Sequence, residues 1–104
     1  MSILNQNPLP FFINGQYVSP TGRQTFENIN PVNGTLNFDV LESNADDVDH
    51  AVNSARSALA GPWAGIDVDK RARLLHKVAD SIDSRRDEFL AAEISDTGQP
   101  VQLA

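Results

Sequence analysis

The stretch 84–100, SRRDEFLAAEISDTGQP, begins as an amphipathic helix and ends in a sharp stop. Its apolar anchors recur at helical spacing, and they are Phe89, Leu90 and Ile94. Gly98 tolerates the left-handed conformation that ends many helices, and Pro100 cannot continue a helix. The pattern therefore predicts that the carboxylate of Asp96 is fixed at a helix C-terminus.

A negative charge at a helix C-terminus is unfavourable because the carbonyl end of the helix macrodipole is itself negative. The placement of Asp96 therefore indicates either nearby hydrogen-bond donors or a bound cation. The residues alone favour the simpler interpretation, in which Asp96 accepts hydrogen bonds from the free amides of the following turn. The alternative combines Asp96 with the turn Asn28-Ile29-Asn30-Pro31, because carbonyl oxygens and one carboxylate suit a hard cation. The sequence leaves open whether these two segments meet.

Two further helices are predicted before this stretch. Asn44 is a good N-cap for the first, whose apolar stripe runs to a stop at Gly61-Pro62. Asp67 caps the second, which carries a clear amphipathic face. We expect a break near residues 84–86, because the apolar stripe changes phase there.

The first forty residues predict two β-hairpins. Asn14-Gly15 between short apolar runs is a strong signal for a type I′ turn joining strands 11–13 and 16–18. Strands 25–29 and 36–40 flank a second turn that contains Pro31 and Gly34. Two hairpins are marginal alone and need further structure to pack on.

Composition narrows the classes of function. The 104 residues fit one small globular domain, and the net charge of -6 argues against nucleic acid or an anionic membrane surface as the main partner. No apolar run approaches the roughly 18 residues of a membrane helix. The chain has no cysteine, which excludes disulfides, thiolate metal sites and a cysteine nucleophile within it. We interpret residues 1–10 as a flexible arm and not as a signal peptide. We expect the protein to be cytoplasmic.

A catalytic constellation is not evident in these residues. The chain has no glycine-rich phosphate loop of the dinucleotide-binding or Walker type. His50 and His76 each have an acid one turn away, which would suit a metal pair or an acid–base dyad. A solvated helix face is the favoured interpretation, because the two histidines lie on different helices without a third ligand in view.

The ordered segments resemble the N-terminal part of the NAD(P)-dependent aldehyde dehydrogenase superfamily over roughly residues 11–100. The matching segments are Phe12-Ile13-Asn14-Gly15, Thr25-Phe26-Glu27, Ile29-Asn30-Pro31, Gly34, Asp46-Asp47-Val48-Asp49, Ala51-Val52, Ala55-Arg56, Gly61-Pro62-Trp63, Arg71-Ala72-Arg73-Leu74-Leu75, Val78-Ala79-Asp80, Leu90-Ala91-Ala92-Glu93 and Asp96-Thr97-Gly98-Gln99-Pro100. The family often has lysine where this chain has Gln99.

The resemblance implies an α/β fold in which residues 11–104 form the truncated N-terminal portion of a Rossmann-type cofactor domain, as two β-hairpins followed by three helices. It implies a parent enzyme that oxidises an aldehyde to a carboxylic acid with NAD or NADP. In the family a cysteine thiolate attacks the aldehyde, hydride passes to the nicotinamide, and a glutamate-activated water releases the acid. These groups lie downstream in such enzymes, so we expect no catalytic or cofactor-binding residue here and no activity from this chain alone. The full-length protein is expected to be a homo-oligomer, a dimer or tetramer.

Some members of the family bind a structural sodium or potassium ion. By motif position, the resemblance places its ligands on the backbone carbonyls of Asn28 and Ile29 and on Asp96. Within the family, the segments at residues 61–63, 78–80 and 89–93 look similar to dehydrogenases of hydroxymuconic or aminomuconic semialdehyde, with betaine-aldehyde-like enzymes as a rival. Two other classes stay open: a non-catalytic binding or oligomerisation module derived from the family, and a small structural protein unrelated to it.

Overall fold

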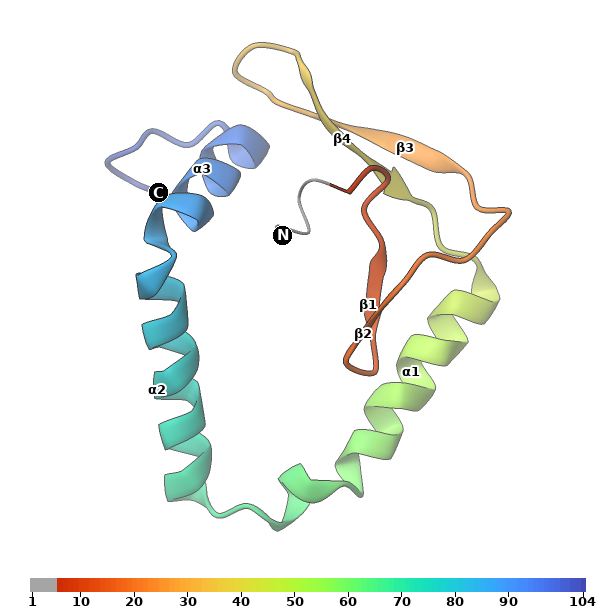
Figure 1. Ribbon diagram of the computed structural model, residues 1–104, viewed down its shortest axis with the longest axis vertical. Coiled ribbons are helices and arrows are strands. Elements are labelled where there is room, and N and C mark those ends of the chain that lie inside the picture. The colour runs from red at the N-terminus through yellow and green to blue at the C-terminus, as the bar shows by residue number, and fades with distance from the viewer. Residues whose placement is uncertain (1–5) are drawn as a thin grey trace.

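The computed structural model describes residues 6–104 as two β-hairpins followed by three helices, as expected (Figure 1). The strands are β1 (Phe11–Ile13), β2 (Gln16–Val18), β3 (Thr25–Ile29) and β4 (Leu36–Leu41). The helices are α1 (Ala45–Leu59), the short 3-10 helix η2 (Pro62–Gly65), α2 (Val68–Ser84) and α3 (Arg86–Thr97).

The first hairpin has the turn that its sequence predicts. Asn14 and Gly15 both have positive φ angles, 54° and 73°, as a type I′ turn requires. β1 and β2 pair antiparallel, and the rings of Phe12 and Tyr17 lie opposite each other with centroids 4.9 Å apart. Cross-strand aromatic pairs of this kind stabilise a short two-stranded sheet.

The second hairpin contains an irregularity that the sequence did not suggest. β3 and β4 pair antiparallel, but the register shifts between Asn28, which pairs with Phe38, and Ile29, which pairs with Leu36. Asn37 is therefore the extra residue of a β-bulge. A bulge bends its strand and redirects the side chain at that point.

The segment before β1 contacts the second hairpin. The backbone amide of Leu9 donates to the carbonyl of Asp39 at 3.0 Å, and the side-chain amide of Asn7 donates to the Asp39 carboxylate at 3.2 Å. Residues 1–5 of the predicted flexible arm lie outside the described residues. The flexibility of residues 1–10 stays a prediction.

The helices begin and end close to their predicted signals. Asn44 caps α1 within a capping box, and the side chain of Asp67 accepts from the amide of Lys70 at the start of α2. The predicted break is confirmed, because α2 ends at Ser84 and α3 begins after Arg85. None of the helices in the described residues is both long enough and apolar enough to cross a membrane.

The elements form an open ring. In Figure 1, α1 lies on one side, α2 and α3 lie on the other, and the β3–β4 hairpin runs across the top. The radius of gyration is 16.9 Å, whereas a compact domain of this length has about 13 Å. Within residues 6–104, Leu41 alone is buried, with 8% of its surface exposed. The amphipathic faces predicted from the sequence are therefore formed but largely uncovered.

Candidate functional site

The C-terminus of α3 ends as its sequence predicts. Gly98 has a left-handed backbone with φ 72°, and its amide donates to the carbonyl of Ile94 at 2.9 Å. The next amide, that of Gln99, bonds to the hydroxyl oxygen of Thr97 at 3.3 Å. The first amides after the helix are therefore satisfied by groups of α3 other than the Asp96 carboxylate.

The turn between β3 and β4 packs directly on this helix end. A Cβ atom placed on Gly98 would lie 3.1 Å from Cγ of Pro31 and 3.5 Å from a methyl group of Val32. Glycine is thus needed here for two reasons, its positive φ and the close approach of the turn. The two segments that the sequence left unconnected do meet.

Side-chain amides join the hairpin to α3. Nδ2 of Asn28 donates to Oδ1 of Asp96 at 2.8 Å. Nδ2 of Asn37 donates both to Oδ1 of Asn28 at 2.9 Å and to the carbonyl of Ser95 at 2.8 Å. We call these four residues, Asn28, Asn37, Ser95 and Asp96, the α3 joint.

The structure corrects the local interpretation of Asp96. Its carboxylate accepts from Asn28, which is 68 residues away in sequence, and not from the amides of the following turn. The reason is tertiary: the docked hairpin supplies an amide donor, while Thr97 and Ile94 accept from the turn. No local pattern around Asp96 contains that donor.

Among residues 6–104, no cationic side chain forms an ion pair with the carboxylate of Asp96. Within residues 6–104 the ion pairs are Arg23–Asp47 and Arg85–Glu88, and neither involves Asp96. In the same part of the chain, Oδ2 of Asp96 accepts no hydrogen bond. Carboxylate and carbonyl oxygens are the ligands of hard cations, so the chemistry of this donor set fits Na⁺ or K⁺.

Of the residues predicted to hold a cation, Asn28 and Asp96 are in direct contact, but through the side-chain amide of Asn28 and not through the backbone carbonyl that was predicted as a ligand. Ile29 follows Asn28 at the bulge. The binding of a cation by these three residues stays a prediction. Asn37 was not predicted as part of the site. Asn37 is one of two polar side chains that alternate with apolar ones in β4, and strand alternation alone neither singles it out nor locates a bulge.

A second polar contact lies at the other end of the hairpin, at the N-terminus of α1. The guanidinium of Arg23 binds the Asp47 carboxylate with two bonds, Nε–Oδ2 at 2.6 Å and Nη2–Oδ1 at 2.8 Å. Asp47 also accepts from the backbone amide of Asn44 at 3.0 Å. We call these three residues, Arg23, Asn44 and Asp47, the α1 joint.

The bonds from Arg23, and then the bond from the Asn44 amide, lower the pKa of Asp47 from an ordinary value of 3.8 to about 2. The same ion pair raises the pKa of Arg23. The sequence indicated Asp47 only as part of an acidic helix start. Arg23 was missed because it is 24 residues away, at no spacing that a pattern specifies.

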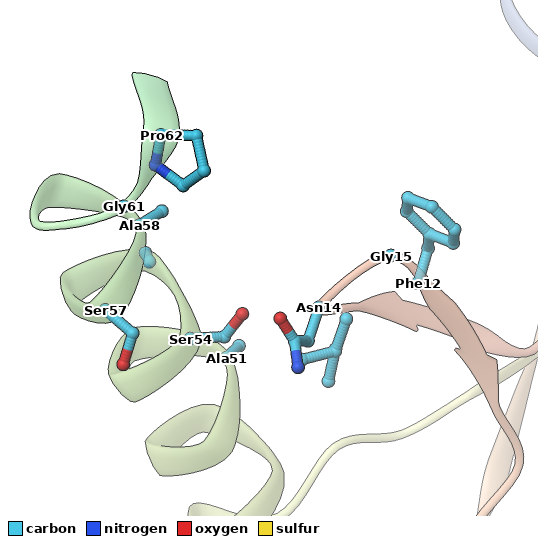
Figure 2. A pocket seen from close by; sticks show the side chains of 11 residues that line it. Phe12, Asn14, Gly15, Ala51, Ser54, Ser57, Ala58, Gly61 and Pro62 are labelled. Carbon is cyan, nitrogen blue, oxygen red and sulfur yellow. The ribbon is translucent and has the colours of Figure 1, made fainter. Parts of the chain in front are cut away.

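An open hollow separates the β1–β2 turn from α1 (Figure 2). Asn14 and Ser54 point toward one another across it, and small side chains such as Ala51 and Ala58 form its helical wall. None of the lining residues is titratable. We assign this hollow no catalytic chemistry, because its polar side chains are amide and hydroxyl groups and include no titratable acid or base.

The histidines do not form a metal site with their neighbours. Within residues 6–104, no three side chains of the His, Cys, Asp and Glu types gather closely enough to hold a metal ion. His50 and His76 are both exposed on their helices.

Comparisons with known proteins agree on one family. The model of the aldehyde dehydrogenase family matches residues 17–104. The chain is 50% identical to 2-hydroxymuconic semialdehyde dehydrogenase of Pseudomonas sp. (strain CF600), over 89% of this chain and 19% of that protein. It is 39% identical to human mitochondrial aldehyde dehydrogenase, over 96% of this chain and 20% of that protein.

Comparison with solved structures gives the same family as comparison of sequences. An aldehyde dehydrogenase from Bacillus cereus, solved as an NAD⁺ complex, matches with a TM-score of 0.86 and 42% identity, over 98% of this chain and 21% of that one. The two hairpins and three helices correspond to the N-terminal part of such enzymes. The chain spans about a fifth of the length of the relatives that it matches. The chain belongs to the aldehyde dehydrogenase family.

Proposed function

We propose that this chain supplies the N-terminal part of an enzyme that oxidises an aldehyde to a carboxylic acid. In the overall reaction, aldehyde, water and NAD(P)⁺ give the acid, NAD(P)H and a proton. The observation that carries the proposal is the match to the Bacillus cereus enzyme, whose structure is an NAD⁺ complex, over 98% of this chain at 42% identity. NAD is the favoured cofactor on this ground.

The 104 residues contribute scaffold and not chemistry in this proposal. They contain no cysteine to attack the aldehyde and no glycine-rich loop to hold a pyrophosphate. The isolated chain is therefore inactive. Turnover by the purified 104 residues with NAD⁺ and an aldehyde would overturn this part of the proposal.

Two relatives support a narrower substrate class. Two 2-hydroxymuconic semialdehyde dehydrogenases, from Pseudomonas sp. (strain CF600) and Pseudomonas putida, share 50% and 43% identity with the chain. We therefore place the substrate among the semialdehydes of aromatic ring cleavage. We also propose that the enzyme is a cytoplasmic homo-oligomer.

A chimera tests the scaffold role. In it, this chain replaces the matching fifth of the strain CF600 enzyme.

We expect the chimera to form NADH from 2-hydroxymuconic semialdehyde at a rate within about tenfold of the parent enzyme, because half of the exchanged residues are identical. The unmodified enzyme is the control. A chimera that is folded and oligomeric but forms no NADH would contradict the assignment to this subgroup.

The same enzyme binds a structural Na⁺ or K⁺ at the α3 joint. Asp96 contributes its carboxylate, and Asn28 and Ile29 contribute backbone carbonyls. The support is the uncompensated charge of Asp96, which lies at an unfavourable helix end with a neutral amide as its donor. A monovalent cation would offset both the charge and the helix dipole.

Thermal unfolding of the chimera tests this cation. We expect a higher midpoint in KCl or NaCl than in tetramethylammonium chloride at equal ionic strength, because a bound ligand stabilises the folded state. Asp96→Asn should abolish the difference, whereas Asp80→Asn, on the exposed surface of α2, should keep it. Rubidium-soaked crystals without an anomalous peak beside Asp96 would contradict the site.

A further inference from the structure

Asparagine followed by glycine is the dipeptide that loses its side-chain ammonia most readily, and this chain contains it twice. Asn14-Gly15 forms the turn between β1 and β2, and Asn33-Gly34 lies in the turn between β3 and β4. Glycine favours the reaction because it has no Cβ atom to shield its backbone nitrogen. The sequence does not separate the two pairs, because both follow a β-branched residue and both are exposed.

The reaction joins the side chain of the asparagine to the backbone of the glycine. The glycine nitrogen gives up its proton to the solvent and attacks Cγ of the asparagine. A new C–N bond closes a succinimide ring, the bond from Cγ to Nδ2 breaks, and Nδ2 takes up a proton and leaves as ammonia. Water then opens the ring and gives either aspartate or isoaspartate, whose backbone runs through Cγ. Water is the only co-reactant.

Hydrogen bonds restrain both reacting groups of the Asn33-Gly34 pair. Oδ1 of Asn33 accepts from the backbone amide of Thr35 at 3.0 Å and from the Thr35 hydroxyl at 2.7 Å. The backbone amide of Gly34, which would supply the attacking nitrogen, donates to the carbonyl of Asn30 at 2.9 Å. These bonds must break before the ring can close, and each one lost raises the barrier to the reaction.

The same turn is also held by packing. Pro31 and Val32 lie against Gly98 at the end of α3, where an added Cβ atom would come within 3.1 Å and 3.5 Å of them. The turn therefore cannot rearrange freely without disturbing its contact with α3. Packing and hydrogen bonding together oppose the backbone rotation that brings the Gly34 nitrogen to Cγ of Asn33.

The Asn14-Gly15 pair has no such restraints. Asn14 points across the open hollow toward Ser54 (Figure 2). Between positions 6 and 104, neither the side-chain amide of Asn14 nor the backbone amide of Gly15 has a hydrogen-bond partner. Both reacting groups are therefore open to solvent and to each other once the backbone rotates.

The hairpin that carries this pair opens at little cost. It joins residues 11–13 to residues 16–18, and its cross-strand aromatic rings, Phe12 and Tyr17, show 64% and 60% of their surface. A short two-stranded hairpin with an exposed face is marginally stable, and such segments open locally. The succinimide ring does not fit a type I′ turn, so this local opening is the step that the reaction needs.

We propose that Asn14 is a site of spontaneous deamidation in this protein, and that the restraints on the β3–β4 turn protect Asn33 from the same reaction. The two products differ in effect. Asp-Gly also suits a type I′ turn, so the aspartate product keeps the hairpin. Isoaspartate adds a backbone atom to a two-residue turn and shifts the register of β1 against β2.

Peptide mass spectrometry of the chimera, aged in mildly alkaline buffer, tests the proposal. Trypsin separates the two pairs, because Asn14 lies in the peptide that ends at Arg23 and Asn33 lies in residues 24–56. We expect Asn14 to convert from amide to acid about tenfold faster than Asn33, or more, because the bonds at Asn33 must break first. In urea the two rates should become similar. Similar rates in the folded chimera, or the same ratio of rates in urea, would overturn the proposal. The reaction needs no catalytic group, so this result is independent of turnover.

Paired threonine variants test whether hydrogen bonding protects Asn33. Thr35→Val removes the hydroxyl that donates to Asn33, and it should speed conversion of Asn33 severalfold without changing Asn14. Thr25→Val is the control in the same hairpin, because between positions 6 and 104 the Thr25 hydroxyl has no hydrogen-bond partner. Equal acceleration in both variants would assign the effect to loss of hairpin stability and overturn the protection of Asn33 by its bonds. No acceleration in Thr35→Val would overturn it as well.

A third variant tests the position of the modification. Asn14→Gln should remove the conversion from the peptide that ends at Arg23, because the longer side chain closes an imide ring much more slowly. Conversion that continues in this peptide would come from another residue and would overturn the assignment to Asn14.

Discussion

The β3–β4 hairpin and the loop before it contact helices at two places, the α1 joint and the α3 joint. The carboxylates at these two joints differ in the charge of the groups that they bind. At the α1 joint, a carboxylate at a helix N-terminus binds a guanidinium through two bonds. At the α3 joint, a carboxylate at a helix C-terminus accepts from a neutral amide. The helix dipole favours Asp47 and opposes Asp96. The α1 joint is therefore electrostatically complete within the described chain, whereas the α3 joint leaves a negative charge available for a ligand.

The joints also differ in how they pack. The α3 joint combines its amide network with direct contact between Gly98 and Pro31, while the α1 joint relies on the ion pair and the capping box. Contact and amide bonds do not depend on pH in the neutral range, and an ion pair weakens when its carboxylate is protonated. Substitutions in the chimera separate these contributions.

The largest effect is expected at the packed contact. Gly98→Ala places a Cβ 3.1 Å from Pro31 on a backbone with φ 72°, and it should lower the free energy of unfolding by about 2–3 kcal/mol. Gly22→Ala is the matched control, because Gly22 has φ 73° and nothing within 4 Å of the added atom. It should cost only the backbone strain, about 1 kcal/mol. Equal midpoints for the two variants in urea would show that the close contact contributes nothing.

A smaller loss is expected from the amide network. Asn37→Ala removes the donor to Asn28 and to the carbonyl of Ser95, and it should lower the free energy of unfolding by about 1–2 kcal/mol. The control is Asn53→Ala on the exposed surface of α1, which should be near neutral. Urea unfolding measures both variants. If Asn37→Ala also matched the parent, the bulge would have no role in holding the joint.

The smallest effect is expected at the α1 joint, and it depends on pH. The pKa of Asp47 is lowered to about 2, so its carboxylate stabilises the folded state above the ordinary value of 3.8. That contribution is lost as the pH falls from 3.8 to about 2. Asp47→Asn should therefore be less stable than the parent at pH 7, and the gap should narrow toward pH 3. Urea midpoints at several pH values measure it. Asp49→Asn, at an exposed position on the same helix, is the control. The difference in urea midpoint between this variant and the parent should not narrow toward pH 3.

Much of the local structure could be predicted from the sequence. Asn14-Gly15, Asn44, Asp67 and Gly98 mark turns and caps through short-range chemistry, and the structure places each of them as expected. Ligand chemistry suggested a pairing of the Asn28–Pro31 turn with Asp96, and the resemblance to the family supported it, but the residues themselves left open whether the two segments meet. Its physical basis, the amide bond and the packed turn, became visible only in the fold.

The sequence by itself determined the order of the strands and α-helices and, to within a residue or two, where they end, because turns, caps and apolar periodicity act over a few residues. It did not indicate the bulge in β4 or the short helix η2. It also carried the family, through an ordered set of motifs. Only the tertiary structure decided which donors reach Asp47 and Asp96, because Arg23 and Asn28 approach them from 24 and 68 residues away. It also decided that the apolar faces stay open. Burial depends on what packs against a face, and the periodicity of one helix does not contain that information.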